Sequence, residues 1–269
     1  MSEAQAVQGR SRMPRKLPRR STKPLMWTVR LLSFVAVVLV WEWYGQKPES
    51  FTIAPFTEVV RAVIDGFADG TLTQAVAGTL VTMSIGYVIA AVIGVSVGLW
   101  IGVSRFARNV LEPLVHAAYA TPVSLMIPIL GIYAGLGLRG RVTLVVLWSV
   151  FEILINTSSG IREVPASLIE LGRSFNASRR QLYQKVVLPA AKPYILLGLR
   201  IGVARAMRGA VTAELLLSAA NLGKVLLRTG STFNIPMLLG SILITIILGV
   251  VLMRVASLIE ERSMRYRIG

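Results

Sequence analysis

The longest uncharged interval of the sequence is the feature that most restricts its fold. No Asp, Glu, Lys or Arg occurs between Gly70 and Ser104, whereas an α-helix needs only about 20 apolar residues to cross the hydrocarbon core of a bilayer. Over the whole chain, 54% of the residues are hydrophobic and 16% are charged, a balance too apolar for one or two soluble domains. We therefore expect a membrane protein.

Other apolar intervals predict further spans. Together with the uncharged interval they predict an all-α polytopic membrane protein with six transmembrane helices, at about residues 25–44, 70–104, 110–136, 142–161, 193–217 and 236–253. Between the first two spans, apolar residues recur at helical spacing from Phe56 to Phe67, which predicts an amphipathic helix on the outer surface. Residues 218–235 are expected to form an outer loop.

Two of the spans carry residues that constrain their backbones. Because each proline removes a backbone donor, Pro113, Pro122 and Pro128 predict a kinked or interrupted third span. Broken helices at membrane depth occur beside protein or a water-filled cavity, so Thr121 to Pro128, with Ser124 between them, is a candidate lining of a translocation path. In the second span, glycines at four- or eight-residue spacing predict a helix-packing face: Gly78, Gly86, Gly94, Gly98 and Gly102.

Charged residues in the fourth and fifth spans need partners, because an isolated charge in a bilayer is costly. Glu152 lies in the middle of the fourth span, and the fifth carries Arg205, Arg208 and Glu214. One interpretation is an internal ion pair between Glu152 and an arginine of the fifth span. The other is a set of charges along a substrate path, whose candidate residues are Thr121, Pro122, Ser124, Glu152, Arg205, Arg208 and Glu214.

The distribution of basic residues predicts the topology. With the N-terminus inside, 20 Lys and Arg residues fall in segments on the inner side and six in the outer loops, so the positive-inside rule places both termini in the cytoplasm. The expected parts are a disordered basic cytoplasmic tail (1–24), a six-span domain (25–260) with a cytoplasmic central loop (162–193), and a C-terminal cytoplasmic tail (261–269). We expect the basic tail to contact anionic lipid rather than nucleic acid.

Several chemistries have no support in the sequence. The chain has no cysteine and one histidine, which leaves no basis for a metal site or a thiol nucleophile. The carboxylates are scattered, which argues against a membrane enzyme. No G-x-x-x-x-G-K-[ST] motif occurs, so an ATP-driven pump built on this chain needs an ATPase from another subunit.

The central loop carries the most specific pattern. Glu170 is followed six positions later by Asn176, then by Ala177 and Ser178, and the pair Leu188 and Pro189 comes about ten residues further on. This order resembles the "EAA" loop of permease subunits of bacterial ABC importers, in the branch that carries sulfonates, taurine and nitrate. The usual Glu-Ala-Ala core reads Glu170-Leu171-Gly172 here, and Asn176 stands in place of the usual glycine. Asparagine is suited to this position because, like glycine, it adopts left-handed backbone angles.

The resemblance implies a type I importer permease fold in the bacterial cytoplasmic membrane. It implies a second permease copy, expected as a homodimer, two ABC ATPase subunits that hold ATP and Mg²⁺, and an extracytoplasmic solute-binding protein. The short helix at about 167–175 would be the coupling helix that docks into an ATPase groove. The residues implied in coupling are Glu170, Leu171, Gly172, Phe175, Asn176, Ala177, Ser178, Leu188 and Pro189.

The substrate implied by the resemblance is a small organic anion. Two alternatives remain open at this stage. One is the same machinery for a vitamin or a pyrimidine precursor. The other, from a different class, is a secondary transporter that works without an ATPase.

Overall fold

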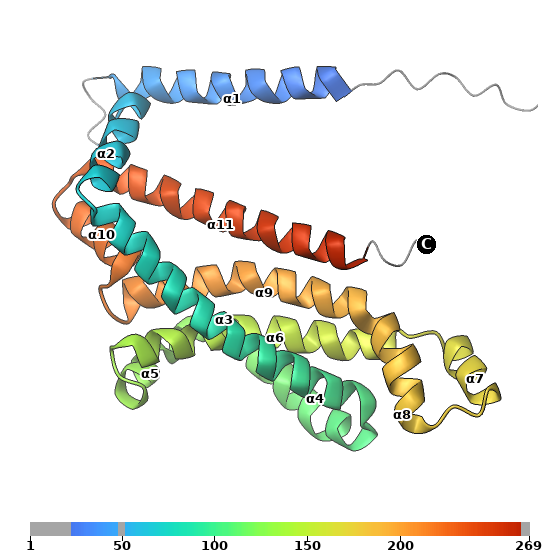
Figure 1. The fold of residues 1–269 in the computed structure, drawn as a ribbon. Coiled ribbons are helices and arrows are strands. Elements are labelled where there is room, and N and C mark those ends of the chain that lie inside the picture. Colours follow the sequence, from blue (N-terminus) through green and yellow to red (C-terminus); the bar gives the residue numbers. More distant parts are fainter. Residues whose placement is uncertain (1–22, 48–51, 265–269) are drawn as a thin grey trace, which may run out of the picture.

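A computed structural model describes residues 23–47 and 52–264, and the described residues form helices joined by short loops (Figure 1). The basic tail up to residue 22 lies outside the described residues. The helical segments are α1 Lys23–Gly45, α2 Phe56–Ala68, α3 Thr71–Val103, α4 Arg105–Ala120, η1 Val123–Met126, α5 Ile127–Tyr133, α6 Leu138–Arg162, α7 Ala166–Ser174, α8 Arg179–Leu182, η2 Tyr183–Val187, α9 Leu188–Leu216, α10 Asn221–Ser231 and α11 Ile235–Met264.

The predicted spans are present as long helices. Among the described residues, five helices are long and apolar enough to cross a membrane, and the pair formed by α4 and η1–α5 makes a sixth when it is counted as one broken span. The two halves of that pair are bent by 89°. The prediction of an interrupted third span is therefore confirmed, and the break begins at Thr121 and Pro122.

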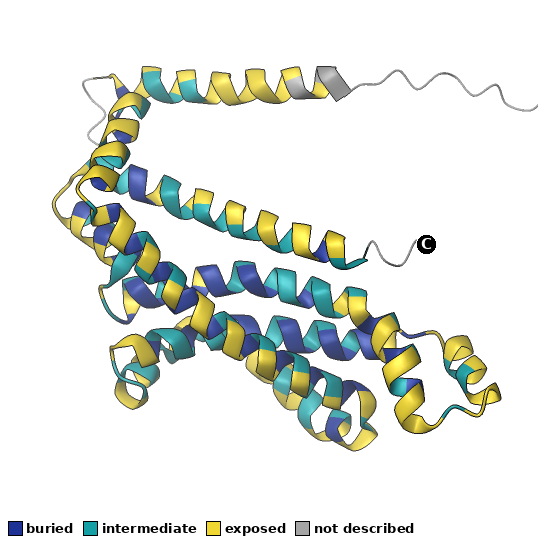
Figure 2. Cartoon of the chain, in the orientation of Figure 1, coloured by how far each residue is buried: buried dark blue, intermediate teal, exposed yellow. Residues whose placement is uncertain are grey.

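The core of the bundle is built by α3, α6 and α9, which carry most of the buried residues of the described chain (Figure 2). Four of the five glycines predicted to form the packing face of α3 lie against α6, whereas Gly78 lies against Asn221 of α10. A Cβ atom at Gly98 would lie 2.7 Å from the Cβ of Thr157, and one at Gly94 would lie 2.9 Å from the Cβ of Ile153. The predicted packing face is confirmed, since only glycine lets the two backbones approach so closely.

The first span stands away from this core and is joined to it through α2 (Figure 1). The indole nitrogen of Trp41 donates to the carbonyl oxygen of Ala54 at 3.0 Å, and the ring meets Phe56 edge to face at 5.4 Å. The amphipathic helix expected in this region is α2. Its buried Val59 packs towards Gly240 at the start of α11.

One sequence-based expectation is wrong, and two helices extend beyond the spans predicted for them. The interval 218–235 is not simply a loop, because it contains α10, which buries Leu222 and Val225. The helix of the fifth span extends on its N-terminal side beyond 193, since α9 begins at Leu188 and helical structure is continuous from Arg179 to Leu216. The last helix continues past 253 to Met264, and its later turns are held to α9 by an ion pair between Arg200 and Glu260.

Candidate functional site

The central loop folds into two short helices that project from one end of the bundle (Figure 1). After α7 the chain turns at Asn176, whose φ of 53° is in the left-handed region, as its replacement of the usual glycine predicts. Ser178 then begins α8. Its side chain accepts from the amide of Gln181, and the Gln181 side chain accepts from the amide of Ser178. This capping box fixes the direction in which the chain leaves the turn.

The helix α7 presents an apolar surface to the outside. Leu168, Leu171 and Phe175 have exposed fractions of 38%, 55% and 79%, and we call these three side chains the α7 apolar surface. Ile169 points the other way and packs against the buried cluster at the ends of α6 and α9. Exposed apolar groups on a helix that is anchored from behind suit docking into a partner's groove, and Glu170 is exposed beside them.

Packing explains why Gly172 stands where the family's Glu-Ala-Ala core has its second alanine. A Cβ atom at this position would lie 2.6 Å from Cδ1 of Leu182 in α8. The missing side chain therefore lets α7 lie close against the segment that leads into α9. The amide of Ala177 closes this turn by donating to the carbonyl oxygen of Gly172 at 3.2 Å.

A π-helical turn, Tyr183–Val187, connects α8 to α9 directly before Leu188 and Pro189. Pro189 has no amide hydrogen to donate to the preceding turn. Pro193, one turn later in α9, lacks this donor as well. Wide turns of this kind are rare and occur often at functional sites. Leu188 and Pro189 thus lie where the short helices of the loop join the span.

The second group of predicted residues is brought together inside the bundle. Arg205 of α9 donates from Nη2 to Oε1 of Glu152 in α6 at 2.5 Å, so the predicted internal ion pair is confirmed. Tyr119 of α4 donates to the same oxygen at 2.9 Å. We call Tyr119, Glu152 and Arg205 the mid-span cluster. Sequence reasoning missed Tyr119, although its place just before the Thr121 and Pro122 break was a usable signal.

The residues at the break between α4 and α5 are exposed. Thr121, Pro122 and Ser124 are all exposed in this chain, and the hydroxyl of Thr121 donates back to the carbonyl oxygen of Ala117 at 3.0 Å. The mid-span cluster and the break are therefore linked through the last turn of α4. This arrangement joins α4, α6 and α9 at one point.

Arg208 lies apart from the mid-span cluster. It is exposed, and among the described residues it has no carboxylate within ion-pair distance. It lines a mainly apolar groove of about 810 Å³ between α9 and α11, together with Thr212 and Thr245. A cation on the wall of a mainly apolar groove attracts an anion more strongly than a cation in bulk water does.

Glu214 is not near either group and is fully buried. Its carboxylate accepts from the hydroxyl of Thr79 at 2.7 Å and from the side-chain amide of Asn221 at 2.6 Å, so it ties α9 to α3 and α10. In this conformation it acts as an internal hydrogen-bonding residue. Within residues 23–47 and 52–264, no group of three His, Asp or Glu side chains is placed to hold a metal ion.

Comparison with known proteins agrees with this geometry. Residues 90–265 match the family described as binding-protein-dependent transport system inner membrane component. A provisionally named ABC transporter permease of Methanocaldococcus jannaschii is 28% identical over 253 residues, covering 92% of this chain and 94% of the relative. The taurine transport system permease of Escherichia coli is 29% identical, covering 70% of this chain and 68% of that protein.

A provisionally named aliphatic sulfonates transport permease of Bacillus subtilis is 27% identical, covering 94% of this chain and 92% of the relative. Among solved structures, the MetNI methionine ABC transporter in an inward-facing conformation has a TM-score of 0.59 at 21% identity, covering 72% of this chain and 94% of that one.

The chain belongs to the family of inner membrane components of binding-protein-dependent transport systems, since the family model covers more than half of it. It is a multi-pass permease subunit of an ABC importer with a type I fold. Its function is transport, and its class implies an ATPase and a binding protein as partners.

Proposed function

We propose that two copies of this chain form an alternating-access path that is driven by two separate ABC ATPase subunits through α7. The observation that carries this proposal is the α7 apolar surface, which is exposed on a helix that is fixed from behind by Ile169 and Gly172. Closure of the ATPase pair on ATP would move both copies of α7, and the rigid helices behind them would transmit the movement.

The nucleotide chemistry lies in the partner. ATP and Mg²⁺ are held by the ATPase, and this chain supplies no phosphate-binding loop. Both termini and α7 lie on the cytoplasmic side, because basic residues favour that side. The residues that contact the ATPase are those of the coupling loop from Glu170 to Ser178, while Leu188 and Pro189 join the loop to α9.

The substrate is a small organic anion of the sulfonate, taurine or nitrate type. Two similar proteins are named for taurine and aliphatic sulfonates, and Arg208 is a cation without an ion-pair partner among the described residues of the spans. Arg205 is already neutralised by Glu152. Arg208 is therefore the first contact for the anion, and Thr121, Pro122 and Ser124 line the path near the break.

The direct test is uptake of labelled taurine into proteoliposomes that contain the permease, the ATPase and the binding protein. We expect uptake only when ATP is supplied on the ATPase side. Uptake that persists without ATP, driven by an ion gradient, would contradict the proposal and establish a secondary transporter instead. Arg208→Gln should lower uptake while ATP hydrolysis remains, and Arg139→Gln, which removes an exposed charge in the first turn of α6, is the matched control.

A further inference from the structure

A polar cleft opens at the end of the bundle opposite α7. It lies between α2, the first turns of α3, α10 and the start of α11, and it has a volume of about 720 Å³. Its floor includes the buried residues Gly66, Ala75 and Val225. None of the sequence-predicted site residues lines it, so it is distinct from the coupling loop and from the substrate path.

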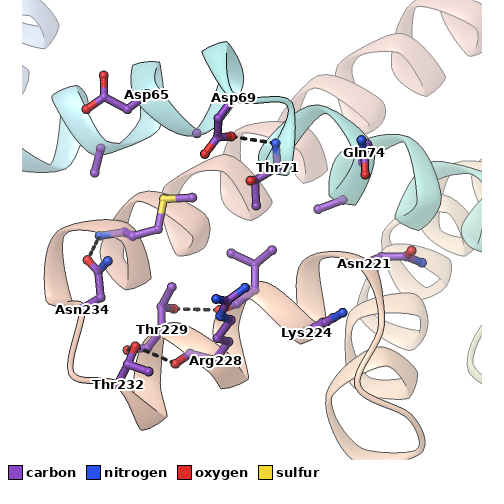
Figure 3. Close-up of a pocket in the computed structure, with 15 residues that line it drawn as sticks. Asp65, Asp69, Thr71, Gln74, Asn221, Lys224, Arg228, Thr229, Thr232 and Asn234 are labelled. Atoms are coloured by element: carbon purple, nitrogen blue, oxygen red, sulfur yellow. Dashed lines mark hydrogen bonds between the residues drawn. The ribbon is translucent and has the colours of Figure 1, made fainter.

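The two long walls of the cleft carry opposite charges (Figure 3). Asp65 and Asp69 lie on the α2 side, and Lys224 and Arg228 face them from α10. All four side chains are exposed, and within the described ranges none of them belongs to an ion pair. Charges of opposite sign held apart across a cleft leave both walls available to a ligand that also carries both signs.

Both walls are held in place by hydrogen bonds within the chain. The carboxylate of Asp69 accepts from the amide of Thr71 at 2.8 Å, which lowers the pKa of Asp69 below its ordinary value and keeps it charged. The α10 wall is held by the bond from Asn221 to Glu214. A cleft that is formed before binding loses less entropy when a ligand enters.

An aromatic side chain stands at the edge of the cleft. Phe233 is 81% exposed, and its neighbours Thr232 and Asn234 both line the cleft. Its φ of 53° is unusual for a bulky residue, so the turn holds the ring outward at a conformational cost. Exposed aromatic groups beside a preformed depression are typical anchors of protein interfaces.

We propose that this cleft is the docking site for a protruding segment of the soluble binding protein. The segment presents a cationic side chain to Asp65 and Asp69 and a carboxylate to Lys224 and Arg228, and Phe233 packs on the surface around it. This inference rests on the proposed function, which puts this end of the bundle outside the cell. A sulfonate without an amino group would need only the basic wall, and the zwitterion taurine is too small to reach both walls and the aromatic rim together, whereas a protein segment uses all three.

The first experiment measures how the binding protein stimulates ATP hydrolysis by the permease–ATPase complex in nanodiscs. We expect the double variant Lys224→Glu with Arg228→Glu to raise the half-saturating concentration of substrate-loaded binding protein by about tenfold or more, because opposite charges become like charges. Phe233→Ala should raise it as well. Hydrolysis without binding protein should match that of the wild type.

The control is Arg139→Glu, which reverses one positive charge, as each half of the double variant does, on an exposed residue outside the cleft. Its half-saturating concentration should remain that of the wild type. Added salt should weaken docking of the wild type, since the Debye length falls to about 8 Å at physiological ionic strength. An unchanged half-saturating concentration in the double variant would overturn the proposal.

A second readout does not depend on ATP hydrolysis. The chain has no cysteine, so Thr232→Cys can carry a single photo-crosslinker at the cleft while all four charges remain. We expect an adduct with the purified binding protein. An adduct only with a second permease copy, or none, overturns the inference, whereas docking without any recruitment of an ATPase would refute the proposed function alone.

Discussion

Removing one member of the mid-span ion pair should destabilise the permease more than removing both. At 2.5 Å and an effective dielectric constant of about 20, the attraction between Glu152 and Arg205 is about 7 kcal/mol before desolvation is subtracted. Loss of one partner from a buried pair costs about 3–5 kcal/mol. Because the Arg205 side chain is 33% exposed, we place Arg205→Gln near the lower end, at about 3 kcal/mol.

The double variant Glu152→Gln with Arg205→Gln leaves no unpaired charge, and we expect it to cost only about 1 kcal/mol. The assay is a double-mutant cycle on the free energy of unfolding in detergent, followed by loss of helical signal as a denaturing detergent is added. A difference of about 2 kcal/mol between Arg205→Gln and the double variant corresponds to a roughly thirtyfold change in the unfolding equilibrium. If the two single costs simply add in the double variant, the ion pair has no energetic role and our reasoning is refuted.

Three further predictions follow from the packing and the topology. Gly98→Ala should lower the free energy of unfolding by about 1–3 kcal/mol, because its Cβ would lie 2.7 Å from that of Thr157; Gly249→Ala, whose Cβ would lie 3.9 Å from Met207, is the control and should be nearly neutral in the same thermal melt. Glu214→Ala should cost about 1–3 kcal/mol in that measurement, since the buried hydroxyl of Thr79 and the partly buried amide of Asn221 lose their acceptor, and a melting temperature equal to that of the wild type would contradict the role given to Glu214. In cysteine-labelling of intact cells, Ser231→Cys should react with a membrane-impermeant maleimide and Ser174→Cys should react only after the cells are opened; the reverse pattern would invert the topology.

The parts of the fold that could be predicted from sequence are those in which one residue type has one physical consequence. A long uncharged interval can only be a span, and prolines at 113, 122 and 128 weaken a helix wherever its neighbours lie. Asn176 falls in the same group, because few residue types accept a positive φ. In each case the local chemistry was sufficient without tertiary contacts.

The parts that sequence reasoning missed depend on neighbours in space. The helix α10 is short, and its apolar residues Leu222 and Val225 matter only because α3 packs over them. An ion pair of Glu152 with the fifth span is predicted from sequence, but the participation of Tyr119 depends on how α4 lies beside α6. The partners of Glu214 likewise come from α3 and α10, far along the chain.

The most direct test of the coupling role of α7 is co-purification of the tagged permease in detergent with its ATPase. We predict that Glu170→Ala weakens the complex and that Phe175→Ala, which removes the most exposed group of the α7 apolar surface, abolishes it. Glu163→Ala, an exposed loop residue before α7, should retain it. A full complex with both α7 variants, or no complex with the wild type, would contradict the central claim that α7 couples this permease to an ATPase.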